Sequence, residues 1–247
     1  MKKLNKGIGI WQIINSSMVT DIIASAGIDI TILDLEHGLH TPETIQNCIY
    51  AANSSSNLLT IARIPSHDYQ YIVQIIDTGI DGILFPHVET KEQLDKIINL
   101  TFLYPFGKKS YSPFVSKYKY GLDQDNKNNP LLGILIESKL GMKNLDSLLS
   151  NPKVDFIYFG AYDLSMEINK NGNIFDPVII ENLKDLISSA KRFNKKIFAI
   201  YRNDNELKIL FKLGVDYPIA SVDTSNLIKK LKDENSKYLE LISKLDS

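Results

Sequence analysis

The sequence predicts a (β/α)₈ barrel because short apolar runs alternate with amphipathic stretches along the whole chain, and eight such runs occur. Strict alternation of strand and helix favours a parallel sheet, and eight repeats in one uninterrupted chain favour its closure into a barrel. Strands are expected at Gly7–Trp11, Ile30–Leu35, Leu58–Ile64, Gly82–Val88, Leu131–Ile136, Val154–Phe159, Lys196–Tyr201 and Tyr217–Val222.

The stretches between these runs carry helix signals. A helix is expected at Pro42–Asn53, because proline suits the first helical turn, and another at Asp68–Thr78, ended by Gly79. A long amphipathic helix is expected at about residues 223–246, with apolar residues at helical spacing. The longest stretch without periodicity is Tyr104–Pro130; a loop of that length in a compact barrel is more often functional or disordered than neutral.

Composition and length favour one ordinary globular domain over residues 1–247. The main alternative, an open doubly wound sheet, usually carries a glycine-rich phosphate turn after an early strand, and the sequence has none. The net charge of −1 implies no nucleic-acid partner, and we expect neither a signal peptide nor a membrane span. The single cysteine, Cys48, is interpreted as a buried apolar residue, and a cytoplasmic protein is expected.

Reactive groups of a parallel barrel belong at the carboxyl ends of its strands. Polar side chains follow five of the predicted strands, and those of the fifth and sixth include Glu137 and Asp163. Hard cations such as Mg²⁺ and Mn²⁺ prefer carboxylates and water, so these two side chains are a candidate metal site for a chelating 2-oxo acid. The alternative is that both carboxylates cap helices, as acidic residues at helix starts often do.

His37 lies three residues after Asp34, a spacing that suggests an imidazole oriented by a carboxylate to accept a proton near pH 7. Arg63 lies at the end of the next predicted strand and is a candidate for stabilising an enolate oxygen; its alternative role is a salt bridge to Asp34 or Glu36. His87 and His67 are weaker candidates, and His40 is expected to be solvated.

Gly160 and Ala161 precede Asp163 where a helix is expected to begin. Free backbone amides at a helix start bind carboxylates, and small residues let a ligand approach closely. The amides from Gly160 through Tyr162 to Asp163 are therefore a candidate site for a substrate carboxylate.

These motifs resemble, in order, those of the HpcH/HpaI family of pyruvate aldolases, in the phosphoenolpyruvate/pyruvate barrel superfamily. The resemblance covers nearly the whole chain and rests on Asp34–Gly38, Ala62–Pro65, Phe85–Val88, Ile136–Ser138 and Gly160–Ser165. It implies that Glu137 and Asp163 hold Mg²⁺, Mn²⁺ or Co²⁺, that His37 with Asp34 handles the aldol hydroxyl proton, and that Arg63 lies over the pyruvate oxygen. It also implies a homohexamer in which the last helix packs on a neighbouring subunit.

Two positions depart from the family pattern. Leu135 stands where the family commonly has a glutamine, which removes a polar group that anchors a metal-bound water. Lys109-Ser110 stands where the family commonly has Arg-Gly, and the aromatic residues Tyr111, Phe114, Tyr118 and Tyr120 follow. We expect Lys109 and these aromatics either to contact a hydroxylated, sugar-like aldehyde or to pack between subunits.

The resemblance therefore favours a metal-dependent aldolase acting on a 4-hydroxy-2-oxo acid, with pyruvate and an aldehyde as the smaller reactants. One alternative is an acyl-CoA lyase like the citrate lyase β relatives. Those relatives usually carry the run Asp-Leu-Glu-Asp, whereas the corresponding run in this chain, Asp34–His37, ends in histidine. The other is a barrel that has lost turnover, an interpretation motivated by Leu135 and Lys109.

Overall fold

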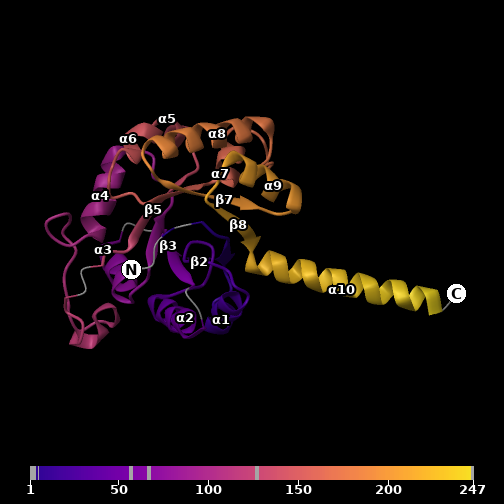
Figure 1. The fold of residues 1–247 in the computed structure, drawn as a ribbon, viewed down its shortest axis with the longest axis horizontal. Coiled ribbons are helices and arrows are strands. Elements are labelled where there is room, and N and C mark those ends of the chain that lie inside the picture. Colours follow the sequence, from indigo (N-terminus) through magenta and orange to yellow (C-terminus); the bar gives the residue numbers. More distant parts are fainter. Residues whose placement is uncertain (1–3, 5, 56–57, 66–67, 126–127, 246–247) are drawn as a thin grey trace.

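Eight parallel strands close into one barrel in sequence order, in a computed structural model that describes residues 4, 6–55, 58–65, 68–125 and 128–245 (Figure 1). Each strand pairs with the next, and β8 closes the barrel on β1. The predicted (β/α)₈ barrel is confirmed. The strands are β1 (Gly9–Gln12), β2 (Ile30–Asp34), β3 (Leu59–Arg63), β4 (Gly82–Phe85), β5 (Leu131–Ile136), β6 (Phe156–Phe159), β7 (Lys196–Tyr201) and β8 (Tyr217–Val222).

Three strands, β5, β7 and β8, have the predicted bounds, and the others differ by a few residues at one or both ends. The largest difference is in β4, which was expected to reach Val88 but ends at Phe85. Pro86 lacks a backbone N–H to continue the ladder, and His87 has a left-handed backbone with φ of 55°. The change of direction at these two residues turns the chain at the rim of the barrel.

Helices follow the strands, and polar caps fix where several of them begin. Asp68 accepts the Tyr71 N–H at the start of α3, and Thr90 and Gln93 form a capping box at the start of α4. The helices are α1 (Ser17–Ser25), α2 (Pro42–Ser55), α3 (Tyr69–Asp77), α4 (Lys91–Thr101), α5 (Lys139–Lys143), α6 (Leu145–Leu149), α7 (Ala161–Glu167), α8 (Pro177–Arg192), α9 (Asp204–Leu213) and α10 (Asp223–Leu245), with the 3₁₀ helix η1 (Ser116–Gly121) between α4 and β5.

The barrel interior is filled by large apolar side chains. Phe156 of β6 stacks on Phe198 of β7 with 4.7 Å between ring centroids, and Phe198 lies 4.8 Å from the ring of Tyr217 on β8. Gly133 on β5 makes room for this stack, since a Cβ there would lie 2.2 Å from the Phe156 ring. The interior is thus a packed core, and a ligand has access only at its ends.

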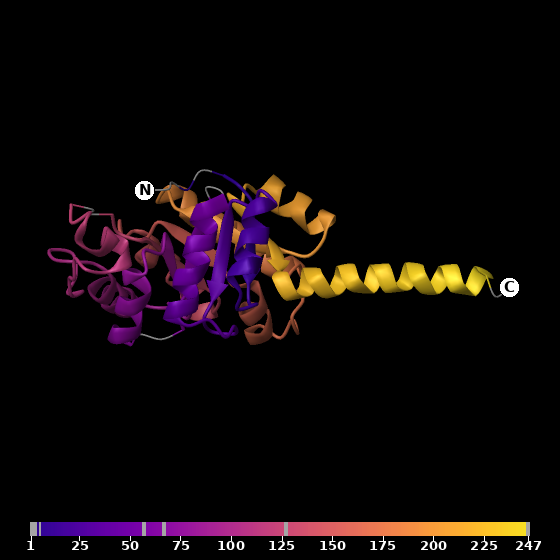
Figure 2. The same ribbon diagram turned by 90° about the horizontal axis from the view of Figure 1, so that it is seen from below.

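The last helix, α10, projects away from the barrel, on the side opposite the α4–β5 segment (Figures 1 and 2). Its first residue, Asp223, accepts the backbone N–H groups of Ile13 and Ile14 and so ties the helix to the end of β1. Beyond Asp223 the helix is exposed, including the apolar Leu227, Leu231 and Leu239. Among the described residues, no helix is long and apolar enough to span a membrane.

Candidate active site

A cavity of about 240 Å³ opens at the carboxyl ends of the strands. Eight of the predicted site residues line it together: Asp34, His37, Arg63, Glu137, Gly160, Ala161, Tyr162 and Asp163. Trp11, Leu135, Tyr158 and Ile200 add apolar surface. Residues more than a hundred positions apart in the sequence therefore meet in one cavity because each follows or ends a strand of the same parallel barrel.

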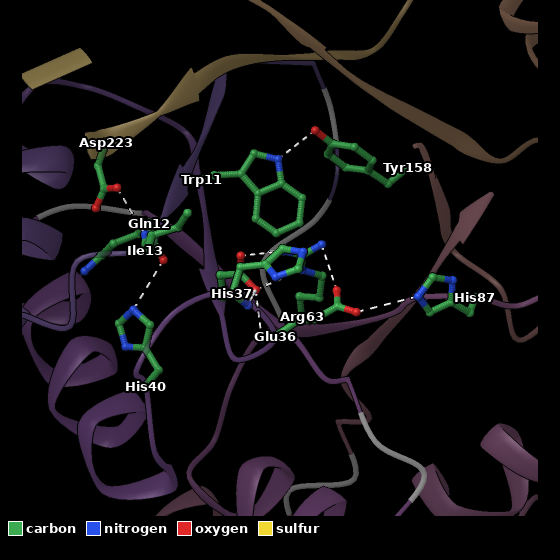
Figure 3. Close-up of polar contacts among 11 residues, drawn as sticks. Trp11, Gln12, Ile13, Glu36, His37, His40, Arg63, His87, Tyr158 and Asp223 are labelled. Atoms are coloured by element: carbon green, nitrogen blue, oxygen red, sulfur yellow. Dashed lines mark hydrogen bonds and ion pairs between the residues drawn. The ribbon is translucent and has the colours of Figure 1, made fainter. Parts of the chain in front are cut away.

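Arg63 is the buried cation of this cavity (Figure 3). Its Nε donates to Asp34 Oδ1 over 2.8 Å, a second guanidinium nitrogen pairs with Asp34 Oδ2, and its Nη1 lies 2.9 Å from Glu36 Oε2. Burial alone would raise the pKa of the Asp34 carboxyl, but the hydrogen bond and charge of Arg63 outweigh it and hold that pKa below its ordinary value. The salt bridges weighed as an alternative for Arg63 therefore exist, and they fix its guanidinium at the cavity wall.

The expected contact between Asp34 and the His37 imidazole is not made. Asp34 Oδ1 accepts the backbone N–H groups of Glu36 and His37, over 2.9 and 3.2 Å, and its remaining capacity is taken by Arg63. The carboxylate therefore shapes the turn after β2 and not the imidazole itself. The His37 side chain is exposed and lines the cavity.

Trp11 and Tyr158 form a buried wall that sequence reasoning missed. The Trp11 indole N–H donates to the Tyr158 hydroxyl over 2.6 Å, and the Arg63 guanidinium lies 4.5 Å from the Trp11 ring centroid (Figure 3). The pairing joins β1 to β6 across the barrel. The signal in the sequence was the phenol hydroxyl group of Tyr158, the polar group of the otherwise apolar run Phe156–Phe159.

Glu137 and Asp163 lie close together, as predicted for a pair of metal ligands. Burial raises the pKa of the Glu137 carboxyl to about 8, the His87 backbone N–H opposes this rise, and the nearby Asp163 carboxylate adds to it. Neither carboxylate is the N-cap residue, since Gly160 precedes α7 and Ser138 caps α5. Asp163 does lie in the first turn of α7, as the alternative role at a helix start requires. Gly160 permits the close approach, because a Cβ there would lie 2.3 Å from the Glu137 Cβ.

His87, a weaker candidate in the sequence, contacts Glu137 of this pair. Its backbone N–H donates to Glu137 Oε1 over 2.8 Å, and its Nδ1 lies 3.0 Å from the same oxygen. Its Nε2 lies 3.7 Å from Glu36 Oε1 (Figure 3). The imidazole therefore bridges Glu137 to the carboxylate that pairs with Arg63. The left-handed backbone after β4 accompanies the turn that brings this side chain to Glu137.

The donor set fits a hard divalent cation. The buried Glu137 carboxylate and the exposed Asp163 carboxylate lie side by side and repel each other when both are charged, and a cation relieves that repulsion. Within the described part of the chain, no group of three or more His, Cys, Asp or Glu side chains is arranged to hold a metal. A cation at Glu137 and Asp163 would therefore take its other ligands from water and substrate, the pattern typical of Mg²⁺ sites.

The sequence model of the HpcH/HpaI aldolase/citrate lyase family matches residues 7–228. The chain belongs to this family. It is 28% identical over 193 residues to the 5-keto-4-deoxy-D-glucarate aldolase of Salmonella gallinarum, and the match covers 76% of this chain and 75% of that one.

Solved structures show the same fold. An HpcH/HpaI aldolase/citrate lyase family protein from Burkholderia cenocepacia superposes with a TM-score of 0.89 at 18% identity over 95% of each chain. The citrate lyase β subunit of M. tuberculosis, solved with oxaloacetate and magnesium, superposes with a TM-score of 0.58 at 13% identity over 90% of this chain and 93% of that one.

Two expectations about polar residues of this HpcH/HpaI family member are wrong. His40 is buried and not solvated, since its Nε2 lies 3.3 Å from the Gln12 carbonyl, and burial lowers the pKa of its imidazole. Lys109 does not reach the cavity, because it is buried and its Nζ donates to Asp77 Oδ1 over 2.7 Å. His67 lies outside the described residues.

The aromatic residues after Lys109 also lie away from the cavity of this chain. Tyr118 is buried and packs edge-on against Tyr111 at 5.2 Å, whereas Tyr111, Phe114 and Tyr120 are exposed. The Tyr50 and Tyr120 hydroxyl groups are 2.8 Å apart, which ties the segment to α2. Family membership leaves both roles considered for these aromatics open, but Lys109 is better explained as an internal ion pair.

Removing the Lys109 side chain is expected to destabilise the fold without changing the site. Lys109→Ala would remove the cation that pairs directly with Asp77, and breaking a buried pair costs roughly 3 kcal/mol of unfolding free energy. Urea unfolding measures this loss, with Lys108→Ala, an exposed neighbour, as the control. A Lys109→Ala protein that is as stable as wild type but has a raised KM for the aldehyde would show that Lys109 contacts the substrate.

Proposed function

We propose that this chain is a divalent-metal-dependent aldolase that cleaves a 4-hydroxy-2-oxo acid to a pyruvate-type 2-oxo acid and an aldehyde, or forms it from them. The proposal is carried by one observation: the close carboxylates Glu137 and Asp163 share a cavity with the buried cation Arg63. Family membership and the relative named as a sugar-acid aldolase support it.

Glu137 and Asp163 would hold the cation, which we propose to be Mg²⁺, Mn²⁺ or Co²⁺. When bound, such a cation polarises the 2-oxo acid and offsets the negative charge that develops on it. The magnesium of the M. tuberculosis relative supports this assignment. The amides of Ala161, Tyr162 and Asp163 at the start of α7 suit the substrate carboxylate. The Gly160 amide is engaged with the Ile136 carbonyl over 2.9 Å, so Gly160 contributes close approach and not a donor.

In the cleavage direction, His37 accepts the proton of the C4 hydroxyl group. The C3–C4 bond then breaks, C4 leaves as the aldehyde, and the electron pair of the bond moves to C3 and the C2 oxygen. Arg63 stabilises the charge on that oxygen, and Asp34 and Glu36 keep its guanidinium in place. Protonation of C3 completes the 2-oxo acid.

Replacing His37 by glutamine is expected to slow cleavage by roughly 10²–10⁴-fold, the usual contribution of a positioned acid–base group. Glutamine keeps the size and polarity of the side chain but does not take up a proton. The KM for pyruvate in the condensation direction should change little. Cleavage at the wild-type rate would show that His37 is only structural.

The aldehyde is proposed to be hydroxylated and derived from a sugar acid. The name of the Salmonella relative supports this, and the half-exposed Tyr162 offers a hydroxyl group at the cavity. The test is a panel of aldehydes with pyruvate and Mn²⁺, read by mass spectrometry, in which hydroxylated aldehydes should react faster than succinic semialdehyde. Cleavage of an acyl-CoA thioester with no aldol product would favour the citrate lyase reaction instead.

We also propose a homo-oligomer, a hexamer as the family resemblance implies, in which α10 packs on a neighbouring subunit. The support is that the apolar side chains of α10, including Leu227, Leu231 and Leu239, are exposed in the single chain. Such a face on a projecting helix is typical of a buried interface. Light scattering on the eluting protein measures the assembly, and a monomer at micromolar concentration would contradict it.

A further inference from the structure

The Tyr158 hydroxyl group is buried at the cavity with its oxygen already engaged. The side chain is 4% exposed, and its oxygen accepts the Trp11 indole N–H over 2.6 Å. The two rings meet edge-on at 5.1 Å, which fixes the phenol in one orientation across the barrel. Tyr158 is therefore a rigid polar group on a wall that is otherwise apolar.

The proton of this hydroxyl group is available to a ligand. An indole N–H is a donor only, so Trp11 cannot receive the phenol proton. Among the contacts of the described residues, Trp11 is the hydrogen-bond partner of Tyr158, and the same residue lines the cavity. A buried hydroxyl group needs an acceptor, and the cavity is where one can be supplied.

The phenol remains a donor at working pH. Burial raises the pKa of Tyr158 well above its ordinary value, although the Trp11 N–H and the charge of Arg63 act against this rise. The group is therefore neutral and protonated near neutral pH. A neutral phenol that accepts one strong hydrogen bond is polarised and becomes a better donor to a second partner.

Tyr158 and Arg63 face the same part of the cavity. The Arg63 guanidinium lies 4.5 Å from the centroid of the Trp11 ring whose N–H holds Tyr158, and both residues line the cavity. Arg63 and Tyr158 are close enough to act on each other electrostatically, and two fixed donors on one cavity wall are an arrangement that stabilises an oxygen as it becomes negative. The geometry favours one oxygen atom shared by a fixed cation and a fixed phenol.

We infer that Tyr158 is a further catalytic residue, whose hydroxyl group donates a hydrogen bond to the 2-oxo oxygen that Arg63 also stabilises. The inference rests on the proposed aldolase function. The oxygen gains negative charge when the C3–C4 bond breaks, or when pyruvate loses a methyl proton. The hydrogen bond is therefore stronger in the enolate than in the ketone, and Tyr158 lowers the barrier more than it tightens pyruvate binding.

The test compares Tyr158→Phe with the wild-type protein in Mg²⁺. Phenylalanine keeps the ring and removes only the hydroxyl group. Exchange of the pyruvate methyl protons in D₂O should slow by about 10²-fold. Oxalate, a planar analogue of the enolate, should bind about ten- to a hundredfold more weakly, while the KM for pyruvate changes little. Tyr118→Phe, which removes a buried hydroxyl group outside the cavity, is the matched control and should exchange at the wild-type rate.

Wild-type exchange and oxalate affinity in Tyr158→Phe would overturn the inference, as would an equal loss in Tyr118→Phe. If Tyr158→Phe fails to fold, 3-fluorotyrosine placed at position 158 gives the answer, because its hydroxyl group is a stronger donor. Oxalate should then bind more tightly than to wild type, and unchanged affinity would overturn the inference. A wild-type protein that exchanges no protons would instead contradict the proposed function.

Discussion

Replacing Glu137 by glutamine, or Asp163 by asparagine, is expected to lower metal-dependent aldol cleavage by roughly 10³-fold or more, the several kcal/mol that a catalytic metal contributes. Each change removes one of the two carboxylates that suit the cation and keeps the shape of the side chain. Because a glutamine oxygen still accepts the His87 N–H, the fold should remain intact. Calorimetric Mn²⁺ titration and the rate of pyruvate release measure the two effects.

Glu167→Gln is the matched control for these variants. Glu167 is an exposed carboxylate at the end of α7 that accepts the Lys139 N–H away from the cavity. It should bind Mn²⁺ and turn over as wild type does. Near wild-type turnover in Glu137→Gln at saturating Mn²⁺ would show that the metal assignment is wrong.

The Glu137 carboxylate also makes the metal affinity depend on pH. Without a cation, burial raises the pKa of Glu137 from 4.5 to about 8, so binding below that pH must displace a proton. Apparent Mn²⁺ affinity should therefore rise by up to about tenfold per pH unit toward pH 8 and then level off. Stability of the metal-free protein changes in the opposite direction. Between pH 4.5 and about 8 the folded state holds a proton on Glu137 that the unfolded state has lost. The contribution of Glu137 to the free energy of unfolding therefore falls as pH rises from 4.5 to about 8.

Replacing Arg63 by methionine is expected to cost both stability and activity. Asp34, whose side chain is 1% exposed, would be left buried without its cation, which lowers the unfolding free energy by about 3–5 kcal/mol. Loss of the positive charge at the 2-oxo oxygen should also lower the rate of cleavage by roughly 10²–10³-fold. Denaturant unfolding and steady-state kinetics measure these two losses separately.

The double variant Arg63→Met with Asp34→Asn separates the two roles. Asparagine removes the unpaired charge and still accepts the backbone N–H groups of Glu36 and His37. Much of the lost stability should therefore return, while activity stays low. Recovery of activity together with stability would mean that Arg63 serves only the structure.

The fold was predictable because each barrel strand carries its own local signal. The runs that became β5, β7 and β8 have their predicted bounds, and β5 is the clearest case because it is a fully buried, uninterrupted apolar run. The end of β4 was placed too far along, because the apolar pattern runs on to Val88 and the turn depends on the backbone of Pro86 and His87.

Most of the candidate site was predictable for a related reason. A polar residue that follows a parallel strand lies at one end of the barrel, so Glu137, Asp163 and Arg63 were brought together by topology alone. The fine contacts were not predictable, because they depend on pairings distant in the sequence. Lys109 and its partner Asp77 are 32 residues apart in the sequence, and Trp11 and its partner Tyr158 are 147 residues apart. Neither pair belongs to one local sequence pattern.

The measurement that tests the central claim most directly is metal-dependent exchange of the pyruvate methyl protons, followed by proton NMR in D₂O. It needs no knowledge of the aldehyde, because loss of a methyl proton forms the same enolate as cleavage does. We predict exchange with Mg²⁺ that is abolished by EDTA and by Glu137→Gln and is unaffected by Glu167→Gln. Exchange that persists in EDTA, or a rate with Mg²⁺ equal to that of pyruvate alone, would contradict the account.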